Sequence, residues 1–307
     1  MENLEGKLID HLSRHGFRSA VAPIFRVKNL QSKMDELLLD NTLNKDFYER
    51  YLSRIDCRIP EHFPETGSII IVAAQQPKVK VEFTIDGRAY SFIIPPTYST
   101  ETDKEVIECL TQFLNRKGYV FSNAIVPEKM LAVHSGLASY GKNNIGYIDG
   151  WGSFFRLTTY FSDMPSFSDR WDNFVLMEQC DGCNACIKKC PTQAISADAI
   201  RISADRCMTF INENPDDFPD WIDRGWQQCL IGCMVCQDVC PVNRQFSRNA
   251  DVGCSFSEEE TKVILQKGIK DKIPEETANK LEKLGMLEEY EAFSRNLEVL
   301  IRIHRQI

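Results

Sequence analysis

The cysteines between Cys180 and Cys240 are spaced like ligands of iron–sulfur clusters. Four of them form a C-x2-C-x2-C-x3-C-P run that ends at Cys190-Pro191, and a shortened version ends at Cys240-Pro241. Runs of this kind bind two [4Fe–4S] clusters, and the last cysteine of each run ligates the cluster of the other run. We therefore expect the first cluster to be held by four thiolates: Cys180, Cys183, Cys186 and Cys240.

The second cluster needs one thiolate from outside the two runs, which supply Cys190, Cys233 and Cys236. Cys207 is the preferred fourth ligand, because it lies in a short strand-like stretch, residues 199–210, that can return to the cluster. Cys229 stays open as the alternative, since the Cys229-x3-Cys233 spacing also brings two thiolates within one turn of chain. A zinc site accepts C-x2-C pairs as well, but so many cysteines with two Cys-Pro endings fit zinc poorly.

Composition favours a globular protein of a reducing compartment. The 307 residues, 43% of them apolar, are enough for one large domain or two modest ones. Twelve cysteines at cluster spacing are not typical of a disulfide scaffold. We predict a cytoplasmic protein, because the first residues lack a signal-peptide pattern and no apolar run approaches the roughly 20 residues that cross a bilayer. A net charge of −8 gives no overall attraction for nucleic acid.

Apolar periodicity predicts a mixed α/β arrangement before the cysteines. Helices are expected at residues 4–16, 30–39, 47–55 and 106–114 and from Pro127, and strands at 20–27, 68–74 and 119–126. Two hairpins are predicted, one at residues 79–94 around Asp86-Gly87 and one at residues 147–161 around residues 150–152. Past residue 241 a helix-start signature at Ser257–Glu260 and short amphipathic helices predict a helical cap over the cluster module.

The polar, glycine-bearing segment at residues 139–146 separates two apolar elements. Such a segment lets the backbone approach a ligand closely, although an ordinary connecting loop has the same composition. Clusters alone conduct electrons, so we expect the residues before Cys180 to bind a cofactor or substrate.

Several motifs resemble those of the epoxyqueuosine reductases, a family similar to the reductive dehalogenases. They are, in order, Val126–Lys129, Gly136–Asn143 (GLASYGKN), Gly152–Leu157 (GSFFRL), the Cys180 run, Arg206-Cys207 and Gly232–Cys236 (GCMVC). The resemblance extends from about residue 68 to about residue 245. It implies an α+β protein with a nitroreductase-like domain at 1–165, a ferredoxin-like two-cluster module at 166–250 and a short helical tail at 251–307.

The resemblance also implies a reductase that uses base-off cobalamin. Electrons would pass from an external low-potential donor, such as a ferredoxin, a flavodoxin or a flavin reductase, through both clusters to the corrinoid. The residues that match the family's corrinoid surroundings are Tyr140, Gly141, Lys142, Asn143, Gly152, Ser153 and Phe154.

One departure from the family concerns proton supply. The family carries a proton-donating Asp six residues before the position of Glu128, and Ser122 stands there in this chain. A serine is not a comparable acid near neutral pH. Lys142, Tyr98 and Tyr140 are the remaining candidates, because reductive dehalogenases use a Tyr with a basic neighbour, although each Tyr also suits ordinary packing.

The short tail and the negative charge favour a small organic substrate over tRNA. Two alternatives stay open. One is a cobalamin-free electron-transfer protein that serves a partner enzyme. The other is epoxyqueuosine reduction on tRNA with a substituted acid, which would need a basic rim built from five scattered residues: Arg54, Arg58, Arg156, Lys188 and Lys189.

Overall fold

A computed structural model describes residues 3–39, 45–174, 176–197, 202–266 and 272–305. Internal contacts divide the chain into two units, each made of two segments. Unit 1 consists of Met1–Gln75 and Thr102–Cys183, and unit 2 of Gln76–Glu101 and Asn184–Ile307. The first predicted hairpin therefore groups with the C-terminal half of the chain. The division at residues 165 and 250 stays a prediction.

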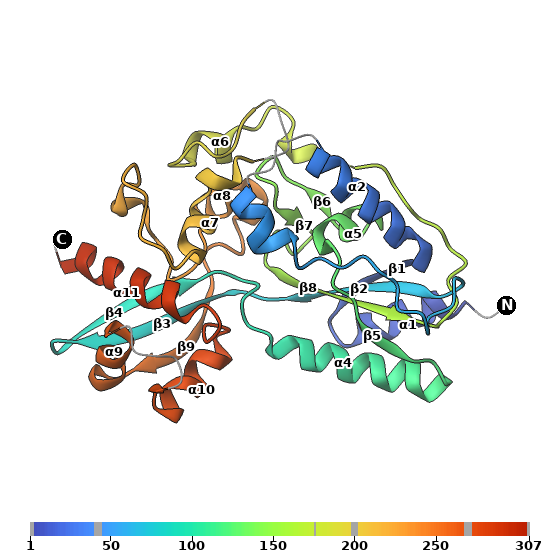
Figure 1. Cartoon of the computed structure of the whole chain (residues 1–307), viewed down its shortest axis with the longest axis horizontal. Coiled ribbons are helices and arrows are strands. Elements are labelled where there is room, and N and C mark those ends of the chain that lie inside the picture. The colour runs from blue at the N-terminus through green and yellow to red at the C-terminus, as the bar shows by residue number, and fades with distance from the viewer. Residues whose placement is uncertain (1–2, 40–44, 175, 198–201, 267–271, 306–307) are drawn as a thin grey trace. The chain divides into compact units, whose positions relative to one another are not determined.

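Unit 1 is built on a four-stranded antiparallel sheet with the order β1-β2-β8-β5. Its strands are β1 (Arg18–Pro23), β2 (Ser68–Gln75), β5 (Phe121–Asn123) and β8 (Phe155–Ser162). The central strand β2 is buried on both faces, as its continuous apolar run predicts. Ile70 and Val72 pack with α1 (Leu4–Arg14) and α4 (Glu101–Leu114). The opposite face carries α2 (Val27–Leu39) and α5 (Glu128–His134), as Figure 1 shows.

Unit 2 contains a three-stranded sheet, β4-β3-β9, that its own helices cover. Its strands are β3 (Lys78–Ile85), β4 (Arg88–Ile94) and β9 (Ala250–Phe256). The predicted hairpin between β3 and β4 is confirmed, and Asp86 and Gly87 both have positive φ, at 51° and 68°. Strand β9, which the sequence did not predict, pairs parallel with β3, and Phe256 stacks on Phe83 with ring centroids 4.9 Å apart.

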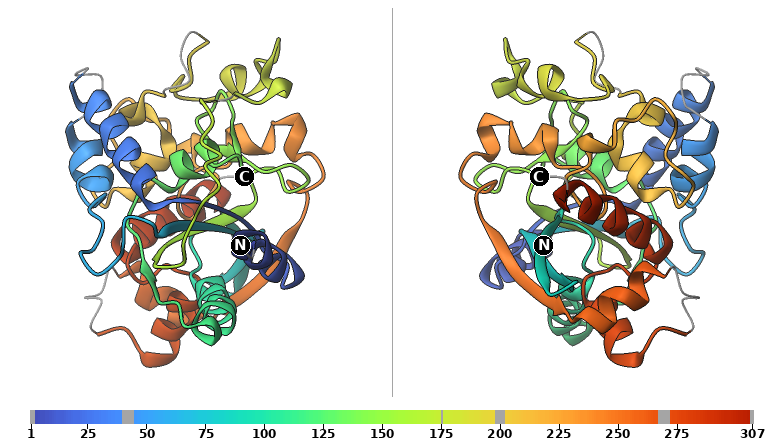
Figure 2. Two further views of the ribbon diagram at one scale, coloured as in Figure 1. Left: turned by 90° about the vertical axis from the view of Figure 1, so that its right-hand side faces the viewer. Right: turned by 90° about the vertical axis from the view of Figure 1, so that its left-hand side faces the viewer.

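Helices of unit 2 fall into a short set near the cysteines and a longer C-terminal set. They are α6 (Ala185–Lys189), α7 (Met208–Glu213), α8 (Val235–Asp238), α9 (Glu258–Leu265), α10 (Glu275–Lys283) and α11 (Tyr290–Arg305). The C-terminal set packs on the β4-β3-β9 sheet, as Figure 1 shows, and in the right view of Figure 2 the dark red helix α11 faces the viewer. Leu281, Leu297 and Leu300 of these helices are at most 1% exposed.

Shorter elements complete both units. They are β6 (Ser139–Tyr140), β7 (Gly146–Tyr147), α3 (Lys45–Phe47), a π-helical turn at Tyr48–Leu52 and 3₁₀ turns at Ile24–Arg26, Asn115–Lys117, Glu178–Cys180, Ala204–Arg206, Arg224–Trp226 and Pro241–Asn243. No helix within the described ranges combines the length and the apolar content that a membrane crossing requires.

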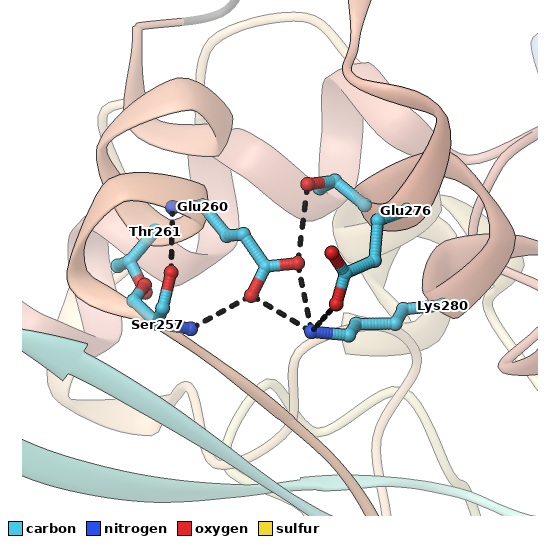
Figure 3. Close-up of polar contacts among 6 residues, drawn as sticks. Ser257, Glu260, Thr261, Glu276 and Lys280 are labelled. Carbon is cyan, nitrogen blue, oxygen red and sulfur yellow. Dashed lines mark hydrogen bonds and ion pairs between the residues drawn. The ribbon is translucent and has the colours of Figure 1, made fainter.

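Helix α9 begins at the predicted signature. Ser257 accepts a hydrogen bond from the backbone N–H of Glu260, and the Glu260 carboxylate accepts one from the backbone N–H of Ser257. Both Glu260 oxygens also lie 2.8 Å from Nζ of Lys280 on α10, as Figure 3 shows. The same side chain therefore caps α9 and joins it to α10.

The strand predicted at 119–126 is shorter, Phe121–Asn123, and the helix predicted at 47–55 is α3 followed by the π-helical turn that ends at Leu52. Three further predicted elements differ from the structure. Residues 147–161 do not form a hairpin, because β7 pairs with β6 whereas β8 pairs with β2 and β5, and only a single bridge joins Ile148 to Gly152. The predicted strand at 20–27 ends at Pro23, and α2 already begins at Val27. Part of the strand-like stretch at 199–210 lies outside the described residues, and its end is helical, since α7 begins at Met208.

Candidate iron–sulfur and reductase site

The thiols assigned to the second cluster come together within unit 2. Burial raises the pKa of the Cys207 thiol, and Cys190 raises it further. Burial also raises the pKa of Cys233 to about 12, with smaller contributions from Cys207 and Cys190. Each of the three thiols is thus close enough to the others to interact electrostatically. Cys236 follows on α8, which packs against α6, the helix that precedes Cys190.

Backbone amides supply hydrogen bonds to two of these sulfurs. Cys207 accepts from the N–H groups of Thr209 and Phe210 in the first turn of α7, and Cys233 accepts from the N–H of Val235 at the start of α8. Hydrogen bonds of this kind stabilise the thiolate form, and they tune cluster potential. The donor set and its amides fit a [4Fe–4S] cluster, which also removes the thiol protons that burial otherwise retains.

Cys229 has different surroundings. It is 2% exposed, forms a backbone bridge with Ile93 of β4, and its thiol interacts electrostatically with Cys233, Asp238 and Lys78. Burial raises its pKa strongly. Cys207, in contrast, interacts with two cysteines of the predicted set, so these surroundings favour Cys207 as the fourth ligand.

The C-terminal helix α11 fixes the two segments that carry Cys207 and Cys233. The buried Asn296 donates to the backbone carbonyls of Asn212 at 2.9 Å and Leu230 at 2.8 Å. Asn212 in turn donates to the carbonyl of Gly232 at 2.7 Å. The predicted tail is therefore hydrogen-bonded into the cluster module, and sequence reasoning missed this role because an Asn inside an amphipathic helix gives no signal of its partners.

The cysteines assigned to the first cluster are divided between the units. Cys180 and Cys183 belong to unit 1, where Cys180 ends a 3₁₀ turn and Cys183 donates its backbone N–H to the Cys180 carbonyl at 3.2 Å. Cys186 lies on α6 and Cys240 follows α8, both in unit 2. Every described cysteine is a free thiol, as cluster ligation requires.

The glycine-bearing loop of unit 1 is held together by its own contacts. The N–H of Gly141 donates to the carbonyl of Ile145 at 2.9 Å, and Nδ2 of Asn143 donates to the hydroxyl of Tyr147 at 3.0 Å. A Cβ at residue 141 would lie 2.7 Å from the Tyr147 ring, so the glycine is needed for packing inside the unit. The close approach that the composition predicts is an approach of protein to protein.

Most residues predicted around a corrinoid are buried in this loop and in the turn after β7. The buried ones are Tyr140, Gly141, Asn143, Gly152, Ser153 and Phe154. Lys142 is the partly exposed member of the set, and its Nζ donates to the carbonyl of Cys183 at 3.1 Å. Lys142 thus suits a ligand contact best, while the buried members shape the loop.

The predicted proton donors lie in unlike surroundings. Tyr140 stacks on Phe174, and burial raises its pKa to about 12, which makes it a weaker proton donor than an exposed phenol. In unit 2 the Tyr98 hydroxyl donates to the carboxylate of Glu213, so its structural partner is acidic. Ser122 is half-buried in β5. Lys142 and Tyr140 share the loop of unit 1.

Glu128 is an acidic residue of unit 1 that was not among the predicted proton donors. Burial raises its pKa to about 7, and the neighbouring Arg156 lowers it less. Arg156 is bound by Asp103 through two hydrogen bonds of 2.5 and 2.8 Å. Glu128 therefore carries an exchangeable proton near neutral pH, and the apolar residues that flank it on α5 are the signal that pointed to its burial.

The comparisons with known proteins agree with this site. Residues 179–243 match a 4Fe-4S double cluster binding domain. The epoxyqueuosine reductase of Cyclobacterium marinum is 32% identical over 216 residues, which are 69% of this chain and 65% of that protein. The epoxyqueuosine reductase of Atelocyanobacterium thalassa is 29% identical over 153 residues, 48% of each chain. The chain thus spans two thirds or less of these relatives.

Solved structures show the same fold. The epoxyqueuosine reductase of Bacillus subtilis superimposes with a TM-score of 0.66 at 19% identity, over 97% of this chain and 81% of that one. The enzyme of Streptococcus thermophilus gives 0.61 at 14% identity, over 98% and 81%. The fold and the cysteine module together define an α+β iron–sulfur protein of the double [4Fe–4S] class. Its particular relatives are the epoxyqueuosine reductases, and the predicted resemblance to them is confirmed.

Proposed function

We propose that this chain is an iron–sulfur oxidoreductase of the epoxyqueuosine reductase type, in which two [4Fe–4S] clusters deliver single electrons to a reaction centre beside unit 1. The observation that carries the proposal is the convergence of Cys190, Cys207 and Cys233 with amide donors directed at two of the sulfurs. The match of residues 179–243 to a double cluster domain supports the same ligands. A cytoplasmic location and a nitroreductase-like unit 1 belong to this proposal.

Cobalamin is the proposed electron acceptor, as the family resemblance implies. When bound, it supplies a strongly reducing and nucleophilic metal centre. Lys142 would hold the corrinoid's polar periphery, since it is the partly exposed member of the predicted set, and the backbone of residues 140–143 and 152–154 would border it. The hydrogen bond from Lys142 to the Cys183 carbonyl connects this loop with the start of the cysteine module.

Proton supply is assigned to groups of unit 1. Ser122 does not replace a carboxylic acid, and a phenol with a pKa of about 12 holds its proton tightly. Glu128 has a pKa of about 7, which is close to the optimum for a general acid at neutral pH. Glu128 and Lys142 are therefore the proposed proton-handling residues.

We propose two candidate substrates, a small organic molecule and epoxyqueuosine in tRNA. One solved relative is described with an epoxyqueuosine-modified tRNA stem loop. Here Arg156 is bound by Asp103 and Arg58 by Asp56, so two members of the predicted basic rim are already neutralised. A small organic substrate remains our first choice, with epoxyqueuosine in tRNA as the second. The electron donor is proposed to be a ferredoxin, a flavodoxin or a flavin reductase.

The decisive experiment is an anaerobic titration of cobalamin into cluster-loaded protein, followed by the spectral change to the base-off form. We expect tight base-off binding, and Lys142→Ala should weaken it about tenfold or more without loss of iron, because a charge-assisted contact is removed. Lys129→Ala is the matched control, since that lysine reaches the same loop through the carbonyl of Asn144.

The alternative function is that of a cobalamin-free electron-transfer protein. Protein with about eight irons that binds no cobalamin would support this alternative and overturn the corrinoid proposal. If cobalamin binds, reduction assays with epoxyqueuosine-containing tRNA decide between the two candidate substrates. Turnover of that tRNA would make it the substrate.

A further inference from the structure

Three side chains that commonly bind metals meet in unit 1, outside the cysteine runs. They are His11 of α1, His15, which directly follows α1 as its C-cap, and Cys109 of α4. One ligand atom from each, two ring nitrogens and the Cys109 sulfur, lie within 4.8 Å of one another. None of the three takes part in the function proposed above.

The fold positions this set firmly. His11 lies in the last turn of α1 and His15 caps its end four residues later, so their rings are neighbours, with centroids 4.6 Å apart. Leu8 and Leu12 of α1 pack in one core cluster with Cys109 and Leu110 of α4, which holds the two helices together. The His11 ring also lies against the Phe113 ring, with centroids 5.4 Å apart. A metal here would join two helices that already touch.

Backbone carbonyls orient both rings. Nδ1 of His15 lies 2.9 Å from the carbonyl oxygen of His11, and Nε2 of His11 lies 3.2 Å from the carbonyl oxygen of Cys109. A neutral imidazole that donates from one nitrogen keeps a lone pair on the other. Metal-binding histidines in proteins typically have this arrangement, in which the second nitrogen donates to a carbonyl or carboxylate.

We propose that His11, His15 and Cys109 bind a zinc ion that joins α1 to α4, with the fourth position open to water. Two imidazoles and one thiolate are a donor set that zinc prefers over magnesium or calcium. Binding replaces the Cys109 thiol proton, which passes to solvent, by the zinc–sulfur bond. Cys109 is 3% exposed and His15 is exposed, so the ion enters from the His15 side.

Two features work against the site and set its strength. Tetrahedral zinc separates its ligand atoms by roughly 3.5 Å, so the rings must rotate inward, which the exposed His15 permits. Arg14 and Arg116 lie close enough to His11 to interact with it electrostatically and repel a cation. The thiolate charge partly offsets this repulsion, so we expect reversible binding that is lost on treatment with a chelator.

The test uses the full chain with both clusters loaded, to which Zn²⁺ alone is added before excess metal is removed. X-ray absorption at the zinc edge is independent of the cluster iron. We expect one zinc per chain with one sulfur at about 2.3 Å and two nitrogens at about 2.0 Å. Added Zn²⁺ should also raise the Tm of the protein, because it binds only the folded state.

His15→Ala is the main variant, because its exposed side chain contributes little to packing. It should lose most of the bound zinc and the Tm rise, and Cys109→Ser should lose the sulfur signal. Cys57→Ser is the matched control, a buried free thiol of the same unit outside the proposed set. A zinc edge with three or four sulfurs, or equal zinc in wild type and His15→Ala, would overturn the site.

Discussion

The second-cluster thiols and the loop at residues 139–146 use their backbone amides in opposite ways. Around Cys207 and Cys233, amides at the starts of α7 and α8 point at sulfur atoms. In the loop, the amide of Gly141 is taken by the carbonyl of Ile145, and that of Asn144 by the carbonyl of Gly141. The amides around the cysteines can stabilise negative charge on a cluster and its thiolates, whereas the amides of Gly141 and Asn144 are already bonded to carbonyls of the loop. In the loop, the partly exposed Lys142 side chain is therefore better suited to contact a ligand than the backbone is.

The largest expected effect is the loss of the second cluster when its fourth ligand is removed. Cys207→Ala should lose about half of the bound iron, because one of two four-iron clusters loses a ligand. Cys229→Ala should keep nearly all of it, since that thiol lies beside a backbone bridge to β4. Iron per folded chain after anaerobic reconstitution is the measurement. The reverse pattern would make Cys229 the ligand.

The second effect concerns the support that α11 gives to the cluster segments. Asn296→Ala removes this donor from the buried Leu230 carbonyl, at a cost of about 1–3 kcal/mol, while the Asn212 carbonyl still accepts from Arg295. We expect a lower Tm and faster loss of the second cluster's iron to a chelator. Arg302→Ala on the same helix is the control, because its exposed pair with Glu298 contributes about 0.3–0.5 kcal/mol. Equal iron loss from both variants would show that α11 does not position the thiols.

The third effect is a pH dependence of stability that arises from Glu128 in unit 1. Burial raises the pKa of Glu128 from 4.5 to about 7, so the folded state binds this proton more tightly than the unfolded state. Stability should therefore fall as pH rises from about 4.5 to about 7 and change little above it. In Glu128→Gln the loss of unfolding free energy over this pH range should be about 1–2 kcal/mol smaller than in wild type. This value is reduced to allow for the partial exposure of the side chain.

Urea unfolding at pH 5 and pH 8 measures this difference. Glu105→Gln, an exposed carboxylate on α4, is the control and should leave the pH dependence unchanged. If Glu128→Gln and wild type lose the same stability between the two pH values, Glu128 does not carry the proton that the proposed function assigns to it.

The sequence predicted best what depends on local spacing. The cysteine runs, the Asp86-Gly87 hairpin and the capping box at Ser257 are each specified by neighbours within a few residues, and the comparisons or the structure confirm them. Strand β9 and the Asn296 contacts escaped prediction because their partners are far away in the chain. The hairpin predicted at 147–161 failed for the same reason, since β8 pairs with the distant β2.

The smallest effect tests whether α9 and α10 support the second cluster as α11 does. Glu260→Ala removes a capping-box acceptor and the bridge to Lys280, so α9 and α10 should lose about 1 kcal/mol together. Neither helix carries a hydrogen bond to the cluster segments like that of Asn296, so iron content should stay at the wild-type level while Tm falls slightly. Lys262→Ala, which breaks only the exposed pair with Glu258, should change Tm less. Iron loss in Glu260→Ala as large as in Asn296→Ala would mean that the whole C-terminal layer, and not one helix, holds the second cluster in place.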